Sequence, residues 1–446
     1  MGTNSARSAS SLPTRILIGL GVGAVAGITL NVLYAPALGA EPSSAYVELG
    51  WWADQMVKPF GDLFLRLLFM VVVPVVFCSL FLGVAGLGSV QKLGALGSRT
   101  LTWFLGTTAI AATLGITLVR LIAPGRNVSP ETVARIKEQY GTIAQAKIEQ
   151  GAEAQGWLQM VVDFVPTNVL GAAADNQRIL GLIIFALILG AAATQVPQDR
   201  IRILRELLEG LYELCLKVLA WVMAFAPIGV ACLIFHATAR LGVDVMRLVG
   251  WYFVTAMGGL VFYQLVVVTL LARVFAGLSP GRFYRGMRTL LVTAFSTSSS
   301  NATMPTTIRT AVDEFGAPKE IAGFVMPLGA TMNMNGTALF EGVSVLFLAQ
   351  VYGIELGWVQ QAMVVGFAVV IAIGAAGVPG GSIPLLAIVL TQVGVPPEFL
   401  ALILGVDRLV DMTRTLPNVS SDLVCSLWLA RREARALSGT GARRGR

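Results

Sequence analysis

The stretch from Asp407 to Asp422 carries charged and amide side chains at helical spacing inside an apolar part of the chain. An α-helix repeats every 3.6 residues, so one stripe of this segment presents its polar side chains together. The stripe consists of Asp407, Asp411, Arg414, Asn418 and Asp422. Facing lipid, it would be very costly, and we therefore expect it to line the interior of a helix bundle.

Arginine and aspartate in this stripe offer complementary chemistry to a charged ligand. Arg414 can donate two parallel N–H groups to one carboxylate. Asp411 lies about one turn away and can accept an ammonium group. An anion site and a cation site this close fit a zwitterion that has an additional carboxylate. A purely structural ion-pair network inside the bundle is the alternative interpretation.

The composition explains which kind of molecule must position these residues. The chain has 446 residues, of which 55% are hydrophobic and 13% are charged, and its mean hydropathy is +0.75. Soluble proteins carry about 25% charged residues. The shortage of charge means that most of the outer surface faces lipid, which excludes a cytosolic enzyme, a disulfide scaffold, a disordered chain and a repeat solenoid.

Six apolar runs in the first 280 residues are candidates for membrane helices, which need about 20 residues each. They are Ile16–Leu33, Leu63–Gly86, Leu101–Ile122, Leu180–Ala193, Val218–Phe235 and Val249–Val274. The fourth run is short, so we expect the stretch from Trp157 to Ala173 to belong to it as part of a broken helix. The polar segment from Arg126 to Gly156 is expected to be a solvent loop.

Between Leu290 and Leu429 the apolar pattern is interrupted by polar runs at Ser296–Thr307, Thr331–Thr337 and Gly374–Pro384. Irregular backbone in a bilayer survives only where it is buried in protein or lines a cavity, and paired interruptions indicate a transporter binding site. We expect the first and third runs to form re-entrant helical hairpins whose tips meet at mid-membrane. A surface linker is the alternative for the serine-rich run, in which we expect the second helical half to start near Pro305.

The interruption at Asn333-Met334-Asn335-Gly336-Thr337 has a different predicted role. An unwound helix releases backbone carbonyl oxygens, and together with Asp422 these would make a hard-oxygen site suited to Na⁺. A simple glycine kink with solvated amides is the alternative. The glycine-rich run lacks the Gly-Lys-Ser/Thr ending of a phosphate loop, so we do not expect nucleotide binding.

Basic residues mark one side of the membrane. The net charge is +7, but the arginines and lysines lie at the ends of apolar runs and in the tail after Leu429, which indicates membrane orientation rather than nucleic-acid binding. The basic residues before the first run, between the second and third, between the fourth and fifth, after the sixth and in the tail all fall on one side if both termini are cytoplasmic. The one histidine, His236, makes a histidine-based metal site implausible.

Four motifs together resemble one family. Ser-Ser-Ser-Asn-Ala-Thr-Met-Pro, Asn-Met-Asn-Gly-Thr, Ala-Ala-Gly-Val-Pro-Gly-Gly and Asp-Met-Thr-Arg-Thr-Leu-Pro-Asn-Val-Ser-Ser-Asp occur in this order between about Leu290 and Leu429. The combination is similar to the glutamate/aspartate:cation symporter family, which includes the excitatory amino acid transporters and archaeal aspartate transporters. This chain resembles a prokaryotic-type member.

The resemblance implies an all-α polytopic fold of eight transmembrane helices and two re-entrant hairpins, assembled as a homotrimer in the inner membrane. It divides the chain into a cytoplasmic tail (1–12), six helices (13–280), a transport core (281–430) and a basic cytoplasmic tail (431–446). Helices 2, 4 and 5 would form a static trimerisation scaffold. Helices 1, 3 and 6 would associate or move with the transport domain in an elevator-type movement.

The resemblance also implies where an acidic amino acid, L-aspartate or L-glutamate, would bind between the hairpin tips. Ser298, Ser299, Ser300 and Asn418 would hold its α-carboxylate, Arg414 and Thr337 its side-chain carboxylate, and Asp411 and Thr415 its amino group. An extracellular lid would consist of Val378, Pro379, Gly380, Gly381 and Ser382.

Two Na⁺ sites follow from the same resemblance. One would use the carbonyls of Gly329, Asn333 and Asn418 with the Asp422 carboxylate. The other would use the carbonyls of Thr331, Ala372, Ile373 and Ala375, and would form only when the lid closes. Coupling would arise because the ion binds the closed state preferentially.

This chain departs from the family pattern at a third Na⁺ site. Asn335 stands where the family usually has aspartate, and Phe104 stands where the archaeal relatives have tyrosine, although Thr107 and Thr108 match. A weakened third site follows. Glu341 stands where the animal transporters carry a glutamate that they use for a proton, so H⁺ is a second candidate for the coupled ion.

Several alternatives remain open on the sequence alone. A C4-dicarboxylate symporter would not need Asp411, and a neutral amino acid carrier would usually lack Arg414. A proton-coupled, sodium-independent glutamate transporter is a further alternative. An ion channel belongs to another class, and a membrane enzyme lacks support because no Ser-His-Asp set, metal cluster or nucleotide loop is present.

Overall fold

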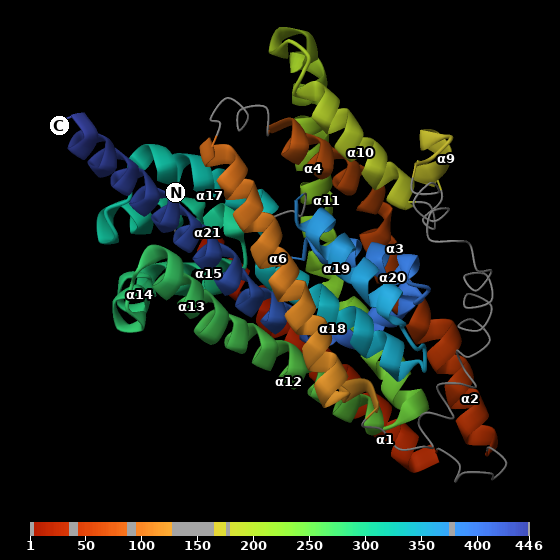
Figure 1. Ribbon diagram of the computed structural model, residues 1–446. Helices are drawn as coiled ribbons and strands as arrows, with labels where there is room; N and C mark the ends of the chain where they lie inside the picture. The colour runs from red at the N-terminus through yellow and green to blue at the C-terminus, as the bar shows by residue number, and fades with distance from the viewer. Residues whose placement is uncertain are drawn as a thin grey trace.

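The computed structural model describes residues 4–34, 43–86, 95–126, 165–174, 179–373 and 380–444, and all regular secondary structure in them is helical. Figure 1 shows the arrangement of these helices. The prediction of an all-α protein is confirmed for the described residues. Nearly all of the expected solvent loop lies outside the described residues. So do the first part of the expected broken helix from Trp157 and residues 374–379 of the glycine-rich run.

The N-terminal half consists of long helices joined by short connections. Their bounds are α1 (Asn4–Tyr34), α2 (Ser44–Trp52), η1 (Ala53–Val57), α3 (Lys58–Met70), α4 (Val72–Gly86), α6 (Ala95–Ile122), η2 (Pro124–Arg126), α9 (Val169–Ala174), α10 (Ile179–Ala193), α11 (Gln198–Leu241), α12 (Asp244–Phe262), η4 (Tyr263–Val268), α13 (Thr269–Leu271) and η5 (Ala272–Ala276).

The C-terminal half is built from shorter helices with breaks between them. They are α14 (Pro280–Gly286), α15 (Arg288–Thr297), α16 (Ser300–Arg309), η6 (Thr310–Glu314), α17 (Lys319–Met332), α18 (Asn335–Val351), α19 (Trp358–Ala372), α20 (Ile383–Gln392), η7 (Pro397–Leu400) and α21 (Ala401–Arg444). The six apolar runs expected in the N-terminal half are helical, and the fourth of them corresponds to α10, which has only 15 residues.

Six described segments are long and apolar enough to cross a membrane. Five coincide with expected runs and the sixth is Lys319–Val351, formed by α17 and α18. In the most apolar 18-residue stretch of this sixth segment, 94% of the residues are buried inside the protein, against 22–47% in the other five. Because protein rather than lipid surrounds it, this segment can carry a backbone break and polar side chains.

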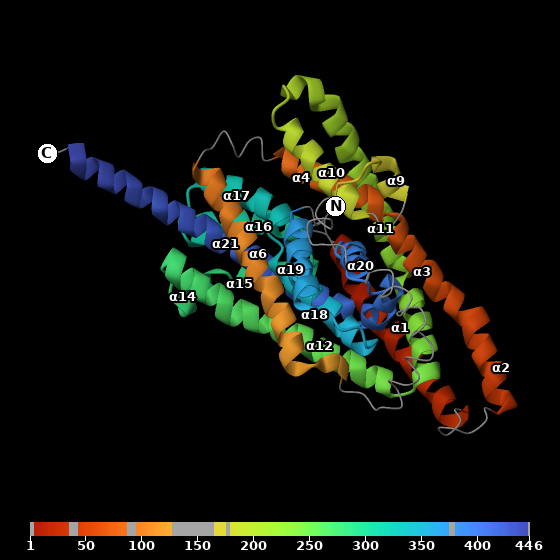
Figure 2. The same cartoon turned by 45° about the vertical axis from the view of Figure 1, so that its right-hand side comes forward.

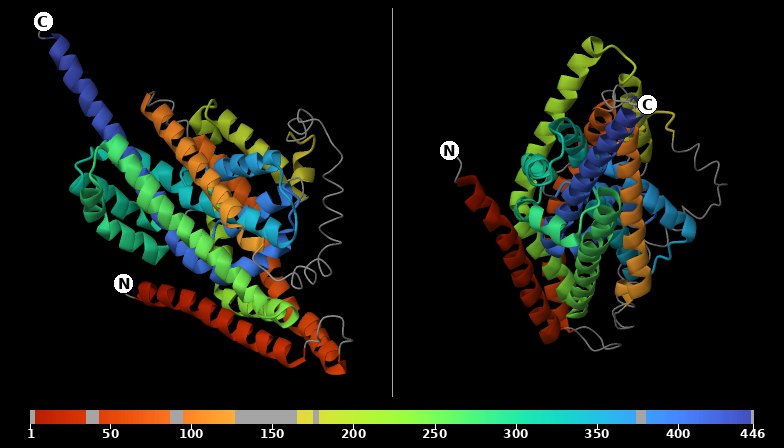
Figure 3. Two further views of the ribbon diagram at one scale, coloured as in Figure 1. Left: turned by 60° about the horizontal axis from the view of Figure 1, so that its bottom comes forward. Right: turned by 60° about the vertical axis from the view of Figure 1, so that its left-hand side comes forward.

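Two groups of helices pack together. The first comprises α1, α3, α4, α10 and α11, in which α11 lies against α1, α3 and α4. In the second, α21 packs against α12, α17 and α18, and α6 packs along α18. Figure 3 shows α1 at the edge of the bundle. The division into a moving and a static part stays a prediction.

Both terminal segments that we expected to be tails are largely helical. Helix α1 begins at Asn4, and α21 continues to Arg444 and projects beyond the bundle in Figure 2. Extending an existing helix adds a hydrogen bond per residue without a new nucleation step, and Ala-Arg-Arg-Glu-Ala-Arg-Ala-Leu is rich in strong helix formers.

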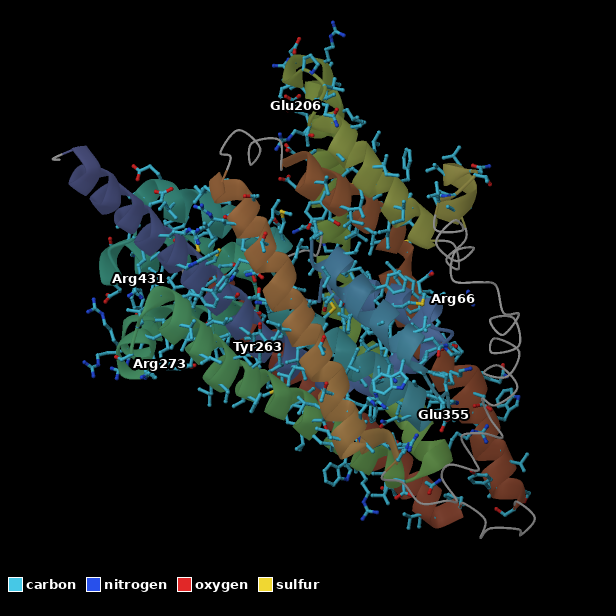
Figure 4. All side chains as sticks on the ribbon, in the orientation of Figure 1. Arg66, Glu206, Tyr263, Arg273, Glu355 and Arg431 are labelled. Atoms are coloured by element: carbon cyan, nitrogen blue, oxygen red, sulfur yellow. The ribbon has the colours of Figure 1, made fainter. Side chains whose placement is uncertain are left out.

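Charged side chains gather at the ends of the helices. Figure 4 places Arg273 and Arg431 together at one end of the bundle and Glu355 toward the other. Many large apolar side chains between these ends are exposed, including Val254, Val261 and Leu265 on α12 and η4. This banding is typical of a protein that contacts lipid around its circumference.

Candidate functional site

The break between α17 and α18 docks directly onto α21. Asn333 and Met334 have non-helical backbone angles, which confirms the predicted interruption of this helix. The N–H of Gly336 donates to the Asn418 Oδ1 on α21 at 2.7 Å. A Cβ on Gly336 would overlap the carbonyl oxygen of Arg414, so only glycine permits this approach.

The predicted polar stripe of α21 faces the protein interior. Arg414 donates from Nε and Nη2 to the Oδ1 of Asp411 at 3.0 and 2.6 Å, and Arg408 donates from Nη1 to the Oδ2 at 3.2 Å. The Nη1 of Arg414 also lies 3.6 Å from the Oδ1 of Asp407. All four side chains are buried, and their formal charges sum to zero.

This cluster leaves binding capacity unused. The Nη1 of Arg414 and the Oδ1 of Asp407 are buried without a hydrogen-bond partner among the described residues, since their 3.6 Å separation is too long for a hydrogen bond. Arg414 also lies over the ring of Phe340, 4.5 Å from its centroid. The guanidinium is thus held in place while one of its donors remains available to a ligand.

The described end of the glycine-rich run reaches the same cluster. Gly380 adopts a left-handed conformation with φ of 75° and donates its N–H to the Asp411 Oδ2 at 3.1 Å. The Ser382 hydroxyl is buried and unpartnered within the described residues. Of the expected lid, Gly380, Gly381 and Ser382 are described and buried, while Val378 and Pro379 lie outside the described residues.

The serine-rich run forms a tight turn between α15 and α16. Ser298 has φ of 49°, and the Ser299 hydroxyl accepts from the Ala302 N–H at 3.1 Å, capping α16. The helix therefore begins at Ser300, and our expectation of a start near Pro305 is wrong. Ser298, Ser299 and Ser300 are buried, and both α15 and α16 pack against α21.

The remaining expected substrate residues also lie on buried faces. The Thr415 hydroxyl donates to the backbone carbonyl of Asp411 at 3.0 Å. Thr337 is buried in the first turn of α18, where its hydroxyl lies 3.9 Å from the sulfur of Met334. The Thr415 hydroxyl is therefore bonded to the backbone of its own helix, and the Thr337 hydroxyl has a weak contact with sulfur.

Two of the residues expected to ligate sodium, Gly329 and Asn333, lie beside Asp422. Its Oδ1 accepts from the Asn333 Nδ2 at 2.8 Å. Gly329 lies so close that a Cβ there would overlap the Asp422 carboxylate. Carboxylate and backbone carbonyl oxygens are hard ligands of the kind that suit Na⁺. Ala372 and Ile373 end α19, and Thr331 lies in the last turn of α17, but Ala375 is outside the described residues.

The residues expected at a third sodium site lie close together, and the weakening of that site stays a prediction. Thr108 donates to the Asn335 Oδ1 at 3.0 Å, and Thr107 donates to the Asn333 Oδ1 at 3.2 Å. The Nδ2 of Asn335 is buried without a partner among the described residues. Phe104 is buried and has no oxygen to contribute. An amide in place of a carboxylate, and a phenyl in place of a phenol, leave this position without an anionic ligand.

Glu341 lies in the middle of α18 and is fully buried. Neither of its carboxylate oxygens has a hydrogen-bond partner among the described residues. Arg408 on α21 is paired with Asp411. Burying an ionised carboxylate without a partner is costly, and a bound proton removes that cost.

Sequence reasoning missed several contacts that support the site. Tyr263 donates to the backbone carbonyl of Thr107 at 3.0 Å, and Trp103 donates to Ser421 at 3.2 Å. Both aromatic residues lie in apolar runs and carry no motif. Their hydrogen bonds become visible only in the fold, where α6 contacts both α21 and η4.

Known proteins are similar in sequence to this chain over most of its length. Residues 12–432 match the model of the Sodium:dicarboxylate symporter family. The chain belongs to this family. It is 33% identical over 384 residues to the Proton/glutamate-aspartate symporter of Escherichia coli, covering 86% of each chain. It is also 33% identical over 427 residues to the Proton/sodium-glutamate symport protein of Bacillus subtilis, covering 95% of this chain and 92% of the relative.

Family membership confirms the resemblance and identifies a multi-pass membrane protein. Family membership does not select a substrate, because the family also includes relatives named as neutral amino acid transporters. The chain is 32% identical over 436 residues to the human Neutral amino acid transporter B(0), covering 91% of this chain and 76% of the relative. Within this family, therefore, the substrate has to be inferred from individual site residues.

Proposed function

We propose that the protein is a secondary active symporter that takes up L-aspartate or L-glutamate together with Na⁺. The observation that carries this proposal is the buried pair of Arg414 and Asp411, which contact each other at 2.6 Å. A bound acidic amino acid would exchange this internal pair for two new ones. Its side-chain carboxylate would take Arg414 and its ammonium group would take Asp411, so neither buried charge would be left alone.

Sodium coupling rests on Asp422 and on the glycine-rich run. An ion beside Asp422 would neutralise a buried carboxylate at the break where Asn333 and Gly336 hold the unwound backbone. Gly380 contacts Asp411 and packs against Met223 of α11, so the end of this run lies between the charged cluster and a neighbouring helix group. A lid there would close over the substrate, and an ion that binds only the closed state would favour closure.

The proposal includes the finer architecture of the family resemblance. It comprises eight membrane helices, two re-entrant hairpins formed by α15–α16 and α19–α20, cytoplasmic termini, an elevator-type movement and a homotrimer in the inner membrane. Exposed apolar side chains on α10 and α11, such as Ile188, Leu207 and Trp221, support contact with lipid or with another subunit.

The direct test is equilibrium binding to the purified full-length protein with and without Na⁺ at two pH values. We expect L-aspartate and L-glutamate to bind, Na⁺ to increase their affinity, and L-serine and succinate to bind much more weakly. Tighter binding of succinate would indicate a dicarboxylate symporter, and tighter binding of L-serine a neutral amino acid carrier. Binding that responds to pH but not to Na⁺ would replace this proposal with proton-coupled, sodium-independent glutamate transport.

Asp422→Asn should make sodium a much weaker promoter of substrate binding, because it removes the one carboxylate expected to ligate the ion. We expect the Na⁺ concentration for half-maximal L-aspartate binding to rise at least tenfold, as expected for the loss of a charge-assisted contact of about 1.5–3 kcal/mol. Glu320→Gln removes an exposed charge from α17 and serves as the control. An unaltered sodium dependence in Asp422→Asn would move the ion site elsewhere or exclude Na⁺ as the coupled ion.

Glu341→Gln should remove the response of transport to a proton gradient. In proteoliposomes, an acidic exterior should stimulate wild-type uptake, since a protonated Glu341 can cross with the substrate without burying a charge. The variant should still bind substrate but show no stimulation. Glu355→Gln, which alters a side chain that is 89% exposed, should respond like wild type. Equal stimulation of wild type and Glu341→Gln, or none in wild type, would exclude Glu341 as the proton carrier.

A further inference from the structure

A hydrogen-bond chain runs from an aromatic side chain of α6 to the carboxylate proposed to bind sodium. The indole N–H of Trp103 donates to the Ser421 Oγ on α21 at 3.2 Å. The same oxygen accepts from the Asn333 Nδ2 at 3.2 Å, and Asn333 in turn donates to Asp422 at 2.8 Å. Ser421 and Asn333 are fully buried and Trp103 is 6% exposed, so water does not compete for these bonds.

The amide of Asn333 is held at both of its ends. Its Oδ1 accepts from the Thr107 hydroxyl at 3.2 Å, while its Nδ2 serves Ser421 and Asp422. The Asp422 carboxylate accepts and therefore faces the amide nitrogen, which determines which way the amide points, while the single hydroxyl proton of Thr107 is shared with the Trp103 carbonyl at 2.8 Å. Asn333 therefore keeps one oxygen of Asp422 engaged and leaves the second oxygen, to which the described residues donate no hydrogen bond, free to ligate an ion.

Ser421 is the link that brings α6 into this arrangement. A serine oxygen has two lone pairs, and here both receive an N–H donor, one from Trp103 and one from Asn333. The two donors fix the position of this oxygen and use both of its lone pairs. It orients Asn333 instead of serving as an ion ligand itself.

Aromatic packing alone does not account for Trp103. Its ring stacks on Trp428 with centroids 5.3 Å apart and meets the edge of Phe275 at 5.0 Å. A phenylalanine could supply much of this apolar contact. The N–H aimed at Ser421 is the additional feature that only tryptophan provides at this position.

From this geometry we infer that Trp103 and Ser421 are positioning residues that set the sodium affinity of the Asp422 site. The inference rests on the proposed function, because it assumes that Asp422 ligates the coupled ion. Without the Trp103 N–H, the Ser421 hydroxyl can turn, and Asn333 loses a constraint on the nitrogen that holds Asp422. The substrate contacts at Arg414 and Asp411 are separate from this chain of bonds.

The experiment compares sodium titrations of L-aspartate binding to the purified full-length protein in lipid nanodiscs. Trp103→Phe and Ser421→Ala should each raise the half-maximal Na⁺ concentration roughly 3- to 10-fold, the effect of one buried hydrogen bond. The double variant should show no greater loss than Ser421→Ala alone. Aspartate affinity at saturating Na⁺ should stay within about twofold of wild type in all three, given the usual additivity error for separate sites.

Trp428→Phe is the matched control, since it perturbs the same stacked pair without touching the chain of hydrogen bonds. Its sodium titration should overlay that of wild type. Ser421→Ala removes a single oxygen from a buried position and provides the second variant if Trp103→Phe does not fold, as judged by size-exclusion chromatography.

Each outcome decides the inference. It is overturned if Trp103→Phe titrates like wild type, if Trp428→Phe loses as much sodium affinity as Trp103→Phe, or if the effects of Trp103→Phe and Ser421→Ala simply add. It is also overturned if Trp103→Phe increases the sodium affinity. Failure of the proposed function looks different, because wild-type binding would then not depend on Na⁺ at all.

Discussion

Arg414→Ala should weaken the binding of L-aspartate and L-glutamate by about 2–5 kcal/mol, which is roughly 30- to 5,000-fold. The variant leaves the side-chain carboxylate of a bound substrate buried without its bidentate partner. It also removes the main partner of Asp411, which among the described residues would keep Arg408 and the Gly380 N–H. Neutral amino acids make no use of this charge and should be affected far less.

Binding to purified protein measures this effect without the complication of transport. Arg414→Lys keeps the positive charge but cannot reproduce the planar, two-donor contact, and it should fall between alanine and wild type. Arg309→Ala removes an exposed arginine from α16 and should change nothing. Unchanged affinity for both acidic amino acids in Arg414→Ala would show that another group selects the carboxylate.

Asp411→Ser should abolish amino-acid transport, because the substrate ammonium group loses its buried acceptor. The structure adds a second consequence. Asp411 is the common partner of Arg408 and Arg414, so the variant removes the carboxylate that pairs with both buried guanidinium groups. Among the ion pairs of the described residues, only that of Arg414 with Asp407 would remain. A site with this excess positive charge should favour a dianion, and we expect uptake of succinate or malate to appear.

Uptake of labelled L-aspartate and succinate by the same proteoliposomes tests the exchange of specificity. Asp313→Ser, which alters an exposed residue of η6, controls for the loss of a carboxylate. Aspartate uptake at the native rate by Asp411→Ser would show that the amino group is held elsewhere. Retention of the wild-type elution volume in size-exclusion chromatography would show that the variant is folded.

The sequence predicted those parts of the site that follow from helical periodicity and from the cost of polar groups in a membrane. The stripe from Asp407 to Asp422 is buried as expected, since no other placement compensates so many charges. The break at Asn333 was also predictable, because the polar residues there interrupt an apolar run. Neither prediction required knowledge of which helix lies opposite.

Contacts between distant segments were not predictable in this way. Trp103 and Ser421 are 318 residues apart, and tryptophan in an apolar run normally indicates only packing. The start of α16 at Ser300 depends on the local cap formed by Ser299, which our emphasis on Pro305 overlooked. The pairing of Asp54 with His236 and Arg240 joins η1 to α11 and likewise has no sequence signature.

Concentrative uptake in proteoliposomes tests the central claim most directly. Purified protein would be reconstituted with equal pH on both sides, an imposed inward Na⁺ gradient and labelled L-aspartate outside. A symporter should accumulate aspartate inside above its external concentration, and the accumulation should disappear when Na⁺ is equal on both sides. Uptake that only equilibrates aspartate across the membrane, or that proceeds equally without Na⁺, would contradict sodium-coupled symport.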